Sequence, residues 1–453
     1  MGSFLPPNLS FVAKQMSNYS RNRFRLETNS TKDVVKSGDV ITVNLPESAL
    51  LDMKSFRWVF KASSEAKGTD ASNLSFFPSN MQSLIERVEI YINGVQVQNG
   101  CAQYNTLCQV LKLGRSNNDR NNSIENCLSK SHVTDIGQAS ATTGVAPTNV
   151  SCVIDKWYGF LNETSTRFLD TSLLGQIQVR ITLATEKVMI PFHKLASKGF
   201  TLSSVTFGAG DLNYNLSEIY FTIDSLVVDP MYSMALRDQL AKNEFIPINY
   251  KEYYTYTLGG QGSDSYQNRF ALSSGSIDKL YGITRPSTYN DGNVEAVTVS
   301  DAGFGTDKHV AKYFAFESLS EATYSGNADN LKYQWSINNV AHGQYRAQLI
   351  EACADLAYIN DKCGDYSSGI MPTNFKTFKT TQCVLPLVLN HPETPISVMS
   401  GYNSRGINSM MVLDVQGLDG AKASSTNQYE SMVIVETTAQ IRAAAGKSLA
   451  TSK

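Results

Sequence analysis

The segment 443–448 is the stretch of this chain whose residue types come closest to a chemical motif. It reads Ala-Ala-Ala-Gly-Lys-Ser and resembles the end of a phosphate-binding loop, in which backbone N–H groups and a lysine hold phosphates. The first glycine of that motif falls at position 441, which is Ile. A second glycine-rich stretch, 259–262, precedes no helix start, and we interpret it as a flexible loop. We therefore predict no nucleotide or other cofactor.

The five histidines show no metal-binding spacing. Zinc requires several nitrogen or sulfur ligands that converge, and no two histidines lie four residues apart. They stand at positions His132, His193, His309, His342 and His391. Asp361 and Asp365 flank Gly364 in a polar stretch, where solvated turn residues are the favoured interpretation and a calcium site is the weaker alternative.

The seven cysteines are odd in number and irregularly spaced, which is typical of reduced, mostly buried thiols. A nucleophilic Cys–His pair stays open as an alternative, because such partners meet only in space. No set of residues forms a catalytic constellation, so we predict that the chain is not an enzyme.

Both ends of the chain are mildly basic, whereas the whole has a net charge of −2. Residues 1–36 hold six lysines and arginines, Arg21, Arg23 and Arg25 among them, against only Glu27 and Asp33. The final stretch adds Arg442, Lys447 and Lys453, with no acid after position 436. Solvated tails are the simplest interpretation. The neutral body argues against a general polyanion-binding surface.

Length and composition favour a two-domain globular protein. A chain of 453 residues exceeds one ordinary core, and 22 Tyr and 20 Phe exclude a disordered protein. No run of 18 apolar residues is present, and the N-terminus lacks the apolar core of a secretory signal. We expect synthesis in the cytoplasm.

Alternating residues predict many strands. Val179 and Ile181 belong to an apolar row at 177–183 that alternates with polar residues, and 56–61 and 219–224 follow the same period of two. Such strands bury one face, as antiparallel sheets do, and helical patterns are few. An all-β sandwich architecture follows. Trp58, Trp157 and Trp335 lie in or beside these strands, so core packing is favoured over stacking on sugars or bases.

One strand–turn–helix unit occurs twice. Residues 88–97 predict a hairpin around Asn93-Gly94, which supplies the positive φ angles of a two-residue turn, and a short amphipathic helix follows from Tyr104 to Leu111. The same order returns at 333–340, followed by a helix-like row made of Tyr345, Leu349, Cys353 and Leu356. The strands at 411–415 and 432–435 then repeat those at 177–183 and 219–228. This ordered set predicts an internal duplication.

The boundary between the halves is predicted near 230–245, where Asp229-Pro230 resembles a helix start. We therefore expect an N-terminal arm (1–35), a first sandwich (36–230), a connecting helix (231–245), a second sandwich (246–440) and a C-terminal tail (441–453). Long polar segments at 114–150 and 259–310 are expected to be loops with functional roles.

The residue pattern of the duplicated unit resembles a known family. Residues 83–94 read Ser-Leu-Ile-Glu-Arg-Val-Glu-Ile-Tyr-Ile-Asn-Gly, with Tyr-Asn-Thr-Leu at 104–107 and Ser-Leu-Leu-Gly-Gln-Ile at 172–177. They resemble the double jelly-roll major capsid proteins, most closely those of polinton-like viruses and virophages, which are small double-stranded DNA viruses. The resemblance is architectural over the whole chain and residue-level only around 83–113 and 166–184. The chain lacks the proline- and aromatic-rich inter-domain segments of giant-virus capsid proteins.

The resemblance implies two tandem eight-stranded antiparallel jelly-roll sandwiches with a few short helices. It implies a structural role in the virion, in which three chains form a pseudo-hexameric capsomer of an icosahedral shell. Two similar domains in each of three chains give six similar lateral faces, which suit a closed lattice. The implied partners are other copies of the chain, minor capsid, penton and cement proteins. No catalytic residue, metal ligand or cofactor is implied.

The basic ends acquire a role in that setting. We expect them to face the shell interior, towards minor capsid proteins, an internal membrane or the genome, because they are cationic beside a neutral body. The residues concerned are Arg21, Arg23, Arg25, Arg442, Lys447 and Lys453.

Two other functions stay open from the sequence. A β-sandwich carbohydrate-binding protein or glycoside-active enzyme would account for the aromatics and strands, but ordinarily shows paired acids on a strand face. A single-jelly-roll minor capsid or spike protein fits less well, because the chain carries a second set of strands.

Overall fold

The structure is a computed structural model of the 453-residue chain. The residues that it describes are 20–29, 32–66, 73–78, 80–99, 101–113, 150–193, 212–227, 245–287, 312–319, 331–360, 382–391, 394–406, 409–418, 428–444 and 447–452, with a few more at 234–242 and 375–379. The predicted loop 114–150, apart from Val150, lies outside them, as do Asp361, Asp365 and residues 288–310 of the second predicted loop.

The first half of the chain forms a β-sandwich. Its large sheet has the strand order β1-β12-β4-β8, with β2 beside β12 and β9 beside β4, and the opposite sheet has the order β3-β10-β6-β7. β5 and β11 pair separately. The strands are β1 (Ser20–Glu27), β2 (Val34–Lys36), β3 (Val40–Asn44), β4 (Leu50–Ala66), β5 (Asn73–Phe76), β6 (Ile85–Ile92), β7 (Val95–Gln98), β8 (Val150–Ile154), β9 (Phe168–Asp170), β10 (Ile177–Leu183), β11 (Ile190–His193) and β12 (Leu212–Val227).

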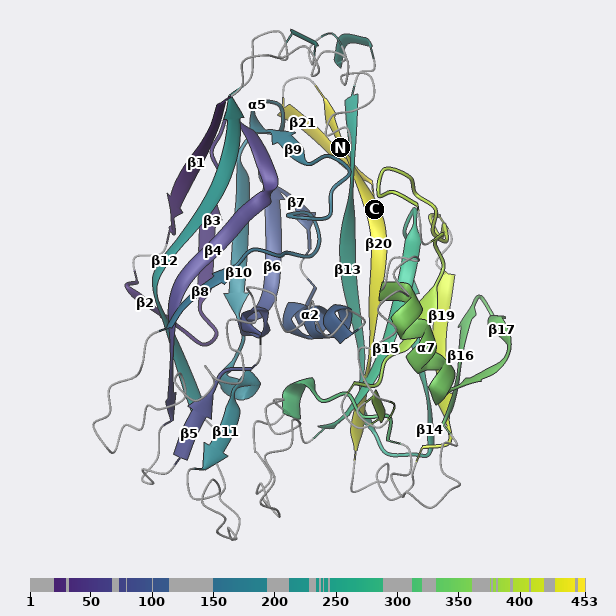
Figure 1. Cartoon of the computed structure of the whole chain (residues 1–453). Helices are drawn as coiled ribbons and strands as arrows, with labels where there is room; N and C mark the ends of the chain where they lie inside the picture. The colour runs from purple at the N-terminus through teal and green to yellow at the C-terminus, as the bar shows by residue number, and fades with distance from the viewer. Residues whose placement is uncertain are drawn as a thin grey trace.

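The second half forms another sandwich beside the first (Figure 1). Its large sheet has the order β13-β20-β15-β18, with β21 beside β20, and the opposite sheet has the order β14-β19-β16-β17. The strands are β13 (Phe245–Gln261), β14 (Ser265–Leu272), β15 (Ile277–Pro286), β16 (Lys332–Ile337), β17 (Val340–Gln348), β18 (Leu385–Val388), β19 (Ser409–Gln416), β20 (Tyr429–Ala444) and β21 (Ser448–Ser452).

The two sandwiches have the same strand order, which confirms the predicted duplication. If the eight strands shared by both are numbered along the chain, each large sheet has the order 1-8-3-6 and each opposite sheet 2-7-4-5. Strand β1 therefore corresponds to β13, β7 to β17 and β12 to β20. The named strands all pair in an antiparallel manner. The prediction of two tandem eight-stranded antiparallel sandwiches is confirmed.

The helices are short. α2 (Tyr104–Leu113) and α7 (Leu349–Asn360) occupy equivalent positions after the fifth strand of each sandwich. Further short helical elements are α5 (Thr171–Leu174) and single 3-10 turns at Met81–Leu84, Glu186–Val188 and Lys312–Phe314. No helix in the described ranges is long and apolar enough to cross a membrane.

Strand patterning determines the core. Along β10 the apolar row from Ile177 to Leu183 is fully buried, whereas the intervening Arg180 is exposed. Each buried side chain of this size contributes about 1.5–3 kcal/mol through removal from water. Trp58, Trp157 and Trp335 are at most 2% exposed, which confirms their predicted place in the core.

Both predicted hairpin turns are present. Asn93 and Gly94 have φ angles of 48° and 79°, and Asn338 and Asn339 have φ angles of 52° and 65°. Positive φ at two successive residues gives the turn a twist that matches the strands it connects. The helix that follows the second hairpin begins at Leu349, so Tyr345 was wrongly assigned to it: Tyr345 lies on β17 and is 65% exposed.

The glycine-rich segment after 259 is also different from the prediction. β13 continues through Gln261, and β14 and β15 follow, so residues 259–286 are largely strands and not a loop. The two glycines lie near the end of a strand, and the residues that flank them still pair with the neighbouring strand. Glycine is also common in loops, so the sequence at this point did not distinguish a strand from a loop.

Strands are present at both ends of the described chain. Residues 20–27 form β1, and β21 pairs with β20 beyond position 441, so both belong to sheets where an arm and a tail were expected. Backbone hydrogen bonding to a neighbouring strand explains the difference, because basic residues are tolerated on an exposed sheet face. In the segment where we predict a connecting helix, the described residues are helical. They are Met234, Ala235, Asp238 and residues 240–242.

The described cysteines match the prediction of reduced, buried thiols. All five are buried, and none of them forms a disulfide within the described residues: Cys101, Cys108, Cys152, Cys353 and Cys383. Burial raises the pKa of Cys101 to about 12, which leaves it a poor nucleophile at neutral pH. Cys127 and Cys363 lie outside the described residues.

Candidate functional site

Arg21 and Arg23 lie on the large sheet of the first sandwich and not in a free arm. β1 pairs with β12 from Ser20 opposite Val227 to Glu27 opposite Tyr220. Nε of Arg23 donates a 2.7 Å hydrogen bond to Asp224 on β12, and Arg21 donates to the other carboxylate oxygen. Residues 20–27, which belong to the predicted N-terminal arm, thus form a strand of this sheet. Whether they face a shell interior stays a prediction.

Two buried carboxylates lie beneath these arginines. The side chains of Asp224 and Asp52 are 2% and 4% exposed, and the two residues are partners across β12 and β4. Arg167 donates two hydrogen bonds of 3.0 and 2.8 Å to Asp52. Burial by itself raises the pKa of Asp224. The hydrogen bonds from Arg23 and Arg21 lower this pKa by more than burial raises it, so the net pKa lies below its ordinary value. Asp224 is therefore ionised at neutral pH.

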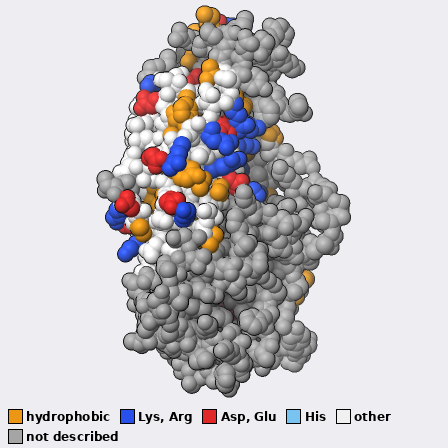
Figure 2. Space-filling model, turned by 60° about the vertical axis from the view of Figure 1, so that its left-hand side comes forward, with side chains coloured by type: hydrophobic (Ala, Val, Ile, Leu, Met, Phe, Trp, Pro, Cys, Tyr) orange, Lys and Arg blue, Asp and Glu red, His pale blue; other side chains and the backbone are white. Residues whose placement is uncertain are grey.

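The arginines themselves face outwards. The side chains of Arg21, Arg23 and Arg25 are 53%, 56% and 65% exposed. Arg25 donates a 2.9 Å hydrogen bond to Glu27 and lies 4.2 Å over the ring of Tyr220. Figure 2 shows lysine and arginine side chains gathered on this side of the molecule. We call the outer face of β1, β12 and β4 the basic face.

The C-terminal residues predicted to share a role with these arginines lie in the other sandwich. Arg442 on β20 donates to Gln440 and lies 4.9 Å over the ring of Phe245. Lys447, in the turn before β21, accepts a 3.2 Å hydrogen bond at its carbonyl from Asn93. Lys453 lies outside the described residues. The structure brings the three β1 arginines together on one strand, whereas Arg442 and Lys447 lie in the second sandwich, on β20 and in the turn before β21.

The large sheet of the second sandwich has a matching buried carboxylate. Glu436 on β20 is 7% exposed in its side chain and accepts a 3.0 Å ion pair from Lys251 on β13. Lys251 also contacts Asp278 at 2.6 Å. Burial raises the pKa of Glu436, but the positive charges of Lys279 and Lys251 lower it more, and its net pKa is below the ordinary value. Each large sheet thus holds an acid on its eighth strand, paired with a basic residue on its first.

The second large sheet is covered by the first sandwich. Glu163, in the segment between β8 and β9, accepts 2.8 Å hydrogen bonds from the backbone N–H of Gly159 and from the hydroxyl of Tyr253 on β13. The carbonyl of Glu163 accepts a 3.0 Å bond from the N–H of Lys251. The pKa of Glu163 is raised to about 7, mainly by burial and to a smaller extent by the negative charge of Glu436.

The fifth strand and the helix after it complete this contact. Tyr250 donates a 2.9 Å hydrogen bond to the carbonyl of Val97 on β7, and its ring meets that of Phe160 edge-on at 5.5 Å. The thiol of Cys101 lies 2.7 Å from the hydroxyl of Thr255. α2 follows directly and lies between the two sandwiches in Figure 1. The sandwiches are therefore joined by a packed and hydrogen-bonded interface.

Among the described residues, the equivalent elements of the second sandwich are more exposed. Val340 and Tyr345 on β17 are each 65% exposed, and Ile350 on α7 is 49% exposed. Figure 1 shows β17 projecting on the side of the molecule opposite β1. We call this set of residues on β17 and α7 the projecting face.

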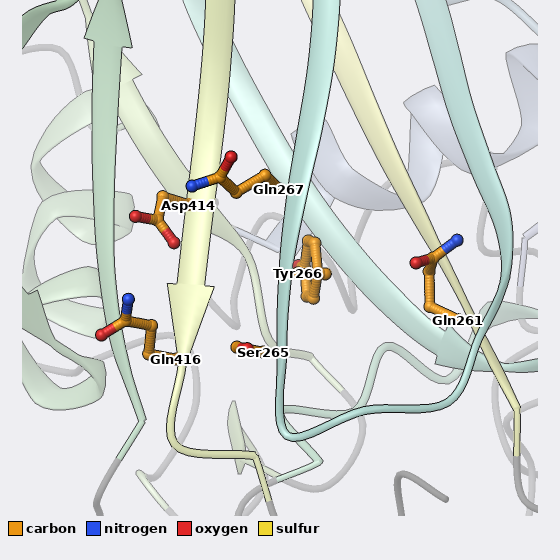
Figure 3. A pocket seen from close by; sticks show the side chains of 6 residues that line it. All are labelled: Gln261, Ser265, Tyr266, Gln267, Asp414 and Gln416. Atoms are coloured by element: carbon orange, nitrogen blue, oxygen red, sulfur yellow. The ribbon is translucent and has the colours of Figure 1, made fainter. Parts of the chain in front are cut away.

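A shallow depression of about 360 Å³ lies at the ends of β13, β14 and β19 (Figure 3). Its lining includes one carboxylate, Asp414, which forms a 2.8 Å ion pair with Arg346. The hydroxyl of Tyr266 is turned into the core, 2.8 Å from that of Thr284. Glycoside hydrolysis requires two acids that flank the bond, so these lining residues do not form such a centre.

The described residues contain no group of three or more histidines, cysteines and carboxylates that could hold a metal ion. His193, His342 and His391 lie in separate parts of the fold, and the other two histidines lie outside the described residues. The segment from 443 to 448, which resembled a phosphate-binding loop, is the end of β20, a turn and the start of β21.

Comparison with known proteins finds similar structures but no similar sequence. No protein-family model matches the sequence, and no curated protein matches it. Solved structures do match. The capsid of PBCV-1 virus has a TM-score of 0.58 at 12% identity, over 96% of this chain and 97% of that chain. The Faustovirus major capsid protein has a TM-score of 0.55 at 9% identity, over 93% and 90%. The Sputnik virophage structure has a TM-score of 0.49 at 11% identity, over 96% and 88%.

The chain has the double jelly-roll fold. The matched regions extend over more than nine tenths of the chain, so both jelly rolls are included. The shared strand order, 1-8-3-6 opposite 2-7-4-5, is found in each jelly roll. Identities of 9–12% account for the absence of a sequence match.

Sequence reasoning missed the acids at the centre of both clusters. Asp224 was visible as the polar member of an alternating strand, and the three arginines of β1 occur at the same period of two. That shared period was the available signal for a strand pair. Glu163 and Glu436 gave no local signal, because their side-chain partners Tyr253 and Lys251 lie in distant segments of the chain.

Proposed function

We propose that this chain is a viral major capsid protein, whose work is self-assembly into the shell of the virion. The observation that carries the proposal is the double jelly roll itself. It spans the length of the chain, with one strand order repeated in both halves, and it is shared with the PBCV-1 capsid structure and the Faustovirus major capsid protein.

We further propose that three copies form a pseudo-hexameric capsomer of an icosahedral shell. Two similar jelly rolls per chain support this arrangement, because three chains then present six similar units around one axis. Minor capsid, penton and cement proteins are the partners proposed for the assembled shell. For Arg442, Lys447 and Lys453 we retain the proposal of contacts in the shell interior, with the genome or an internal membrane.

The proposal is tested with the full chain after expression and purification. Light scattering coupled to gel filtration measures the mass, and negative-stain microscopy shows the outline. We expect three times the monomer mass and particles of hexagonal outline, alone or in shells. A monomer at every concentration tested, without particles, would overturn the proposal. Binding of that monomer to a glycan array would favour the carbohydrate-binding alternative.

A further inference from the structure

Lys251 and Asp278 meet inside the second jelly roll across a strand that lies between them. The strand order is β13-β20-β15, and Lys251 on β13 lies opposite Thr438 on β20. Asp278 on β15 lies at the irregularity between the pairs that Ile277 and Lys279 form with the same strand. Nζ of Lys251 is 2.6 Å from Oδ2 of Asp278. The two side chains therefore connect the strands on either side of β20.

This pair is withdrawn from solvent. The side chains of Lys251 and Asp278 are 12% and 2% exposed. The first jelly roll lies against them, because the carbonyl of Glu163 accepts a hydrogen bond from the N–H of Lys251. Two ions held in the interior carry a desolvation cost that a neutral group does not carry. An uncharged product of the same two side chains would be free of that cost.

Glu436 offers a second carboxylate to the amine. Its Oε1 lies 3.0 Å from Nζ of Lys251, and its side chain is 7% exposed. Burial by itself lowers the pKa of Lys251, but the negative charges of Glu436 and Asp278 raise it by more, so the amine carries a proton at neutral pH. An amine must lose that proton before it can attack a carbon atom. Glu436 is positioned to accept it.

Two hydroxyl groups hold the carboxylate of Asp278. Ser276 donates a 2.7 Å hydrogen bond to Oδ1, and Thr438 donates a 2.5 Å hydrogen bond to Oδ2. The hydroxyl oxygen of Ser276 accepts a 2.9 Å bond from the N–H of Gly401, which fixes its direction. Donors fixed around a carboxyl oxygen stabilise the negative charge that gathers there when a nucleophile adds to the carbon. The cluster thus contains a nucleophile, a polarised carboxyl group and a proton acceptor.

We propose that Lys251 and Asp278 condense to an isopeptide bond within the chain. The new bond joins Nζ of Lys251 to Cγ of Asp278, and the bond from Cγ to Oδ2 breaks. Glu436 takes two protons from Nζ in turn and delivers them to Oδ2, which leaves as water. An ammonium and a carboxylate become an amide and one water molecule, so neither an oxidant nor another reactant is required. Glu436 returns to its starting state.

The position of the pair favours this product. Folding holds the amine beside the carboxyl group, which makes the step unimolecular. The amide removes two charges from the interior. Hydrolysis needs a water molecule, and the side chains of the three reacting residues are at most 12% exposed. The crosslink ties three strands of one sheet together. It concerns the second jelly roll alone and is independent of the proposed capsid function.

The mass of the full chain tests the proposal. We expect the denatured protein to be lighter than its sequence requires by one water molecule. Trypsin does not cleave after an acylated lysine, but it cleaves at Arg269, which lies between the two residues. Digestion should therefore release a branched peptide whose fragments locate the bond at Lys251 and Asp278. The full mass, with both residues in linear peptides after long incubation of the folded protein, would overturn the proposal.

Two exposed ion pairs of the same chain are internal controls. Nζ of Lys61 is 2.6 Å from Glu218, and Nζ of Lys32 is 2.7 Å from Asp39. These distances match that of the buried pair, but the two lysine side chains are 39% and 60% exposed. We expect their peptides to be linear in the same digest. Branched peptides at these pairs to the same extent would contradict the assignment of the reaction to the buried cluster.

Substitutions assign the roles. Lys251→Arg keeps the positive charge but removes the amine, so the missing mass should return. Glu436→Gln keeps the shape of the side chain but cannot accept the proton, and we expect crosslinking to be slowed by about 100-fold or more. Lys279→Arg is the matched control, because it replaces another lysine near Glu436, at 3.9 Å, and should leave the crosslink intact.

The crosslinked fraction of each variant is measured at matched times after synthesis, and circular dichroism verifies that each variant folds. If Lys251→Arg still lacks the mass of one water molecule, the dehydration lies elsewhere and the crosslink is excluded. If Glu436→Gln crosslinks as fast as the unchanged chain, the proton transfer assigned to Glu436 is wrong.

Discussion

Tyr253 of the second jelly roll donates a 2.8 Å hydrogen bond to the buried carboxylate of Glu163 in the first. The bond crosses the interface between the two halves of the chain. Its acceptor is an acid whose pKa is raised to about 7 by burial and by the nearby Glu436. The junction between the jelly rolls therefore contains a group that titrates near neutral pH.

We predict that Glu163 makes stability depend on pH. Its pKa is higher in the folded state than the ordinary value of 4.5, so the folded state keeps the proton longer as pH rises. The free energy of unfolding should fall between about pH 4.5 and 7 and level off above. Glu163→Gln keeps an acceptor for Tyr253 and should remove roughly 2–4 kcal/mol of that difference. Urea unfolding over a pH series measures it, and equal slopes for both proteins would contradict the prediction.

The ion pairs of the basic face should differ in how much they contribute to the free energy of unfolding. Removal of Arg21 and Arg23 together leaves the buried Asp224 without its two charged donors, and we expect it to lower the free energy of unfolding clearly more than the control does, although solvent around the half-exposed arginines weakens the effect. Arg25→Ala is the control. Its partner Glu27 is exposed, so the change should cost at most about 1 kcal/mol. Chemical unfolding compares the two, and a similar cost for both would refute this ranking.

Asp224 also predicts a weakness in acid. Its folded pKa is below the ordinary value of 3.8, so its contribution is present above that value and is lost as pH falls through the folded pKa. Asp224→Asn should unfold with less pH dependence below about pH 4 than the unchanged chain. Circular dichroism during acid titration provides the measurement. An unchanged acid transition would show that the cluster is not the acid-sensitive element.

Gly401 should tolerate no side chain. A Cβ there would collide with the carbonyl oxygen of Ile277 and with the carboxylate of Asp278, and the backbone of Gly401 is held by a 2.9 Å bond from its N–H to Ser276. Gly401→Ala should therefore cost about 1–3 kcal/mol in the free energy of unfolding. Gly259→Ala, with no atom near the added methyl group, should change it by less than about 0.5 kcal/mol. Equal melting temperatures for both variants would exclude the collision.

The local elements were predictable because their signals are local. The alternation at 177–183 corresponds to β10 residue by residue, and Asn93-Gly94 forms the turn that its sequence demands. The repeated order of such units also predicted the duplication. Where the pattern was ambiguous the prediction failed, as for Tyr345, which continues an apolar row of helical spacing yet lies on an exposed strand.

The contacts between distant segments were not predictable. Arg21 and Arg23 have a basic, tail-like composition, and only the pairing of β1 with β12 reveals the buried Asp224 that they neutralise. Glu163 and Glu436 belong to different jelly rolls, and their proximity is a property of the interface. A single sequence contains no record of such pairs.

The covalent connection between the two jelly rolls has a consequence for the speed of assembly. One helix-to-sheet contact forms during folding, at the high effective concentration that a tether provides, and needs no encounter between molecules. A closed ring of three chains would then require two diffusional steps, where six separate jelly rolls would require five. Because the two halves are fused, part of the assembly takes place as first-order folding, whose rate does not depend on protein concentration. We expect the gain in assembly rate to be largest at low protein concentration.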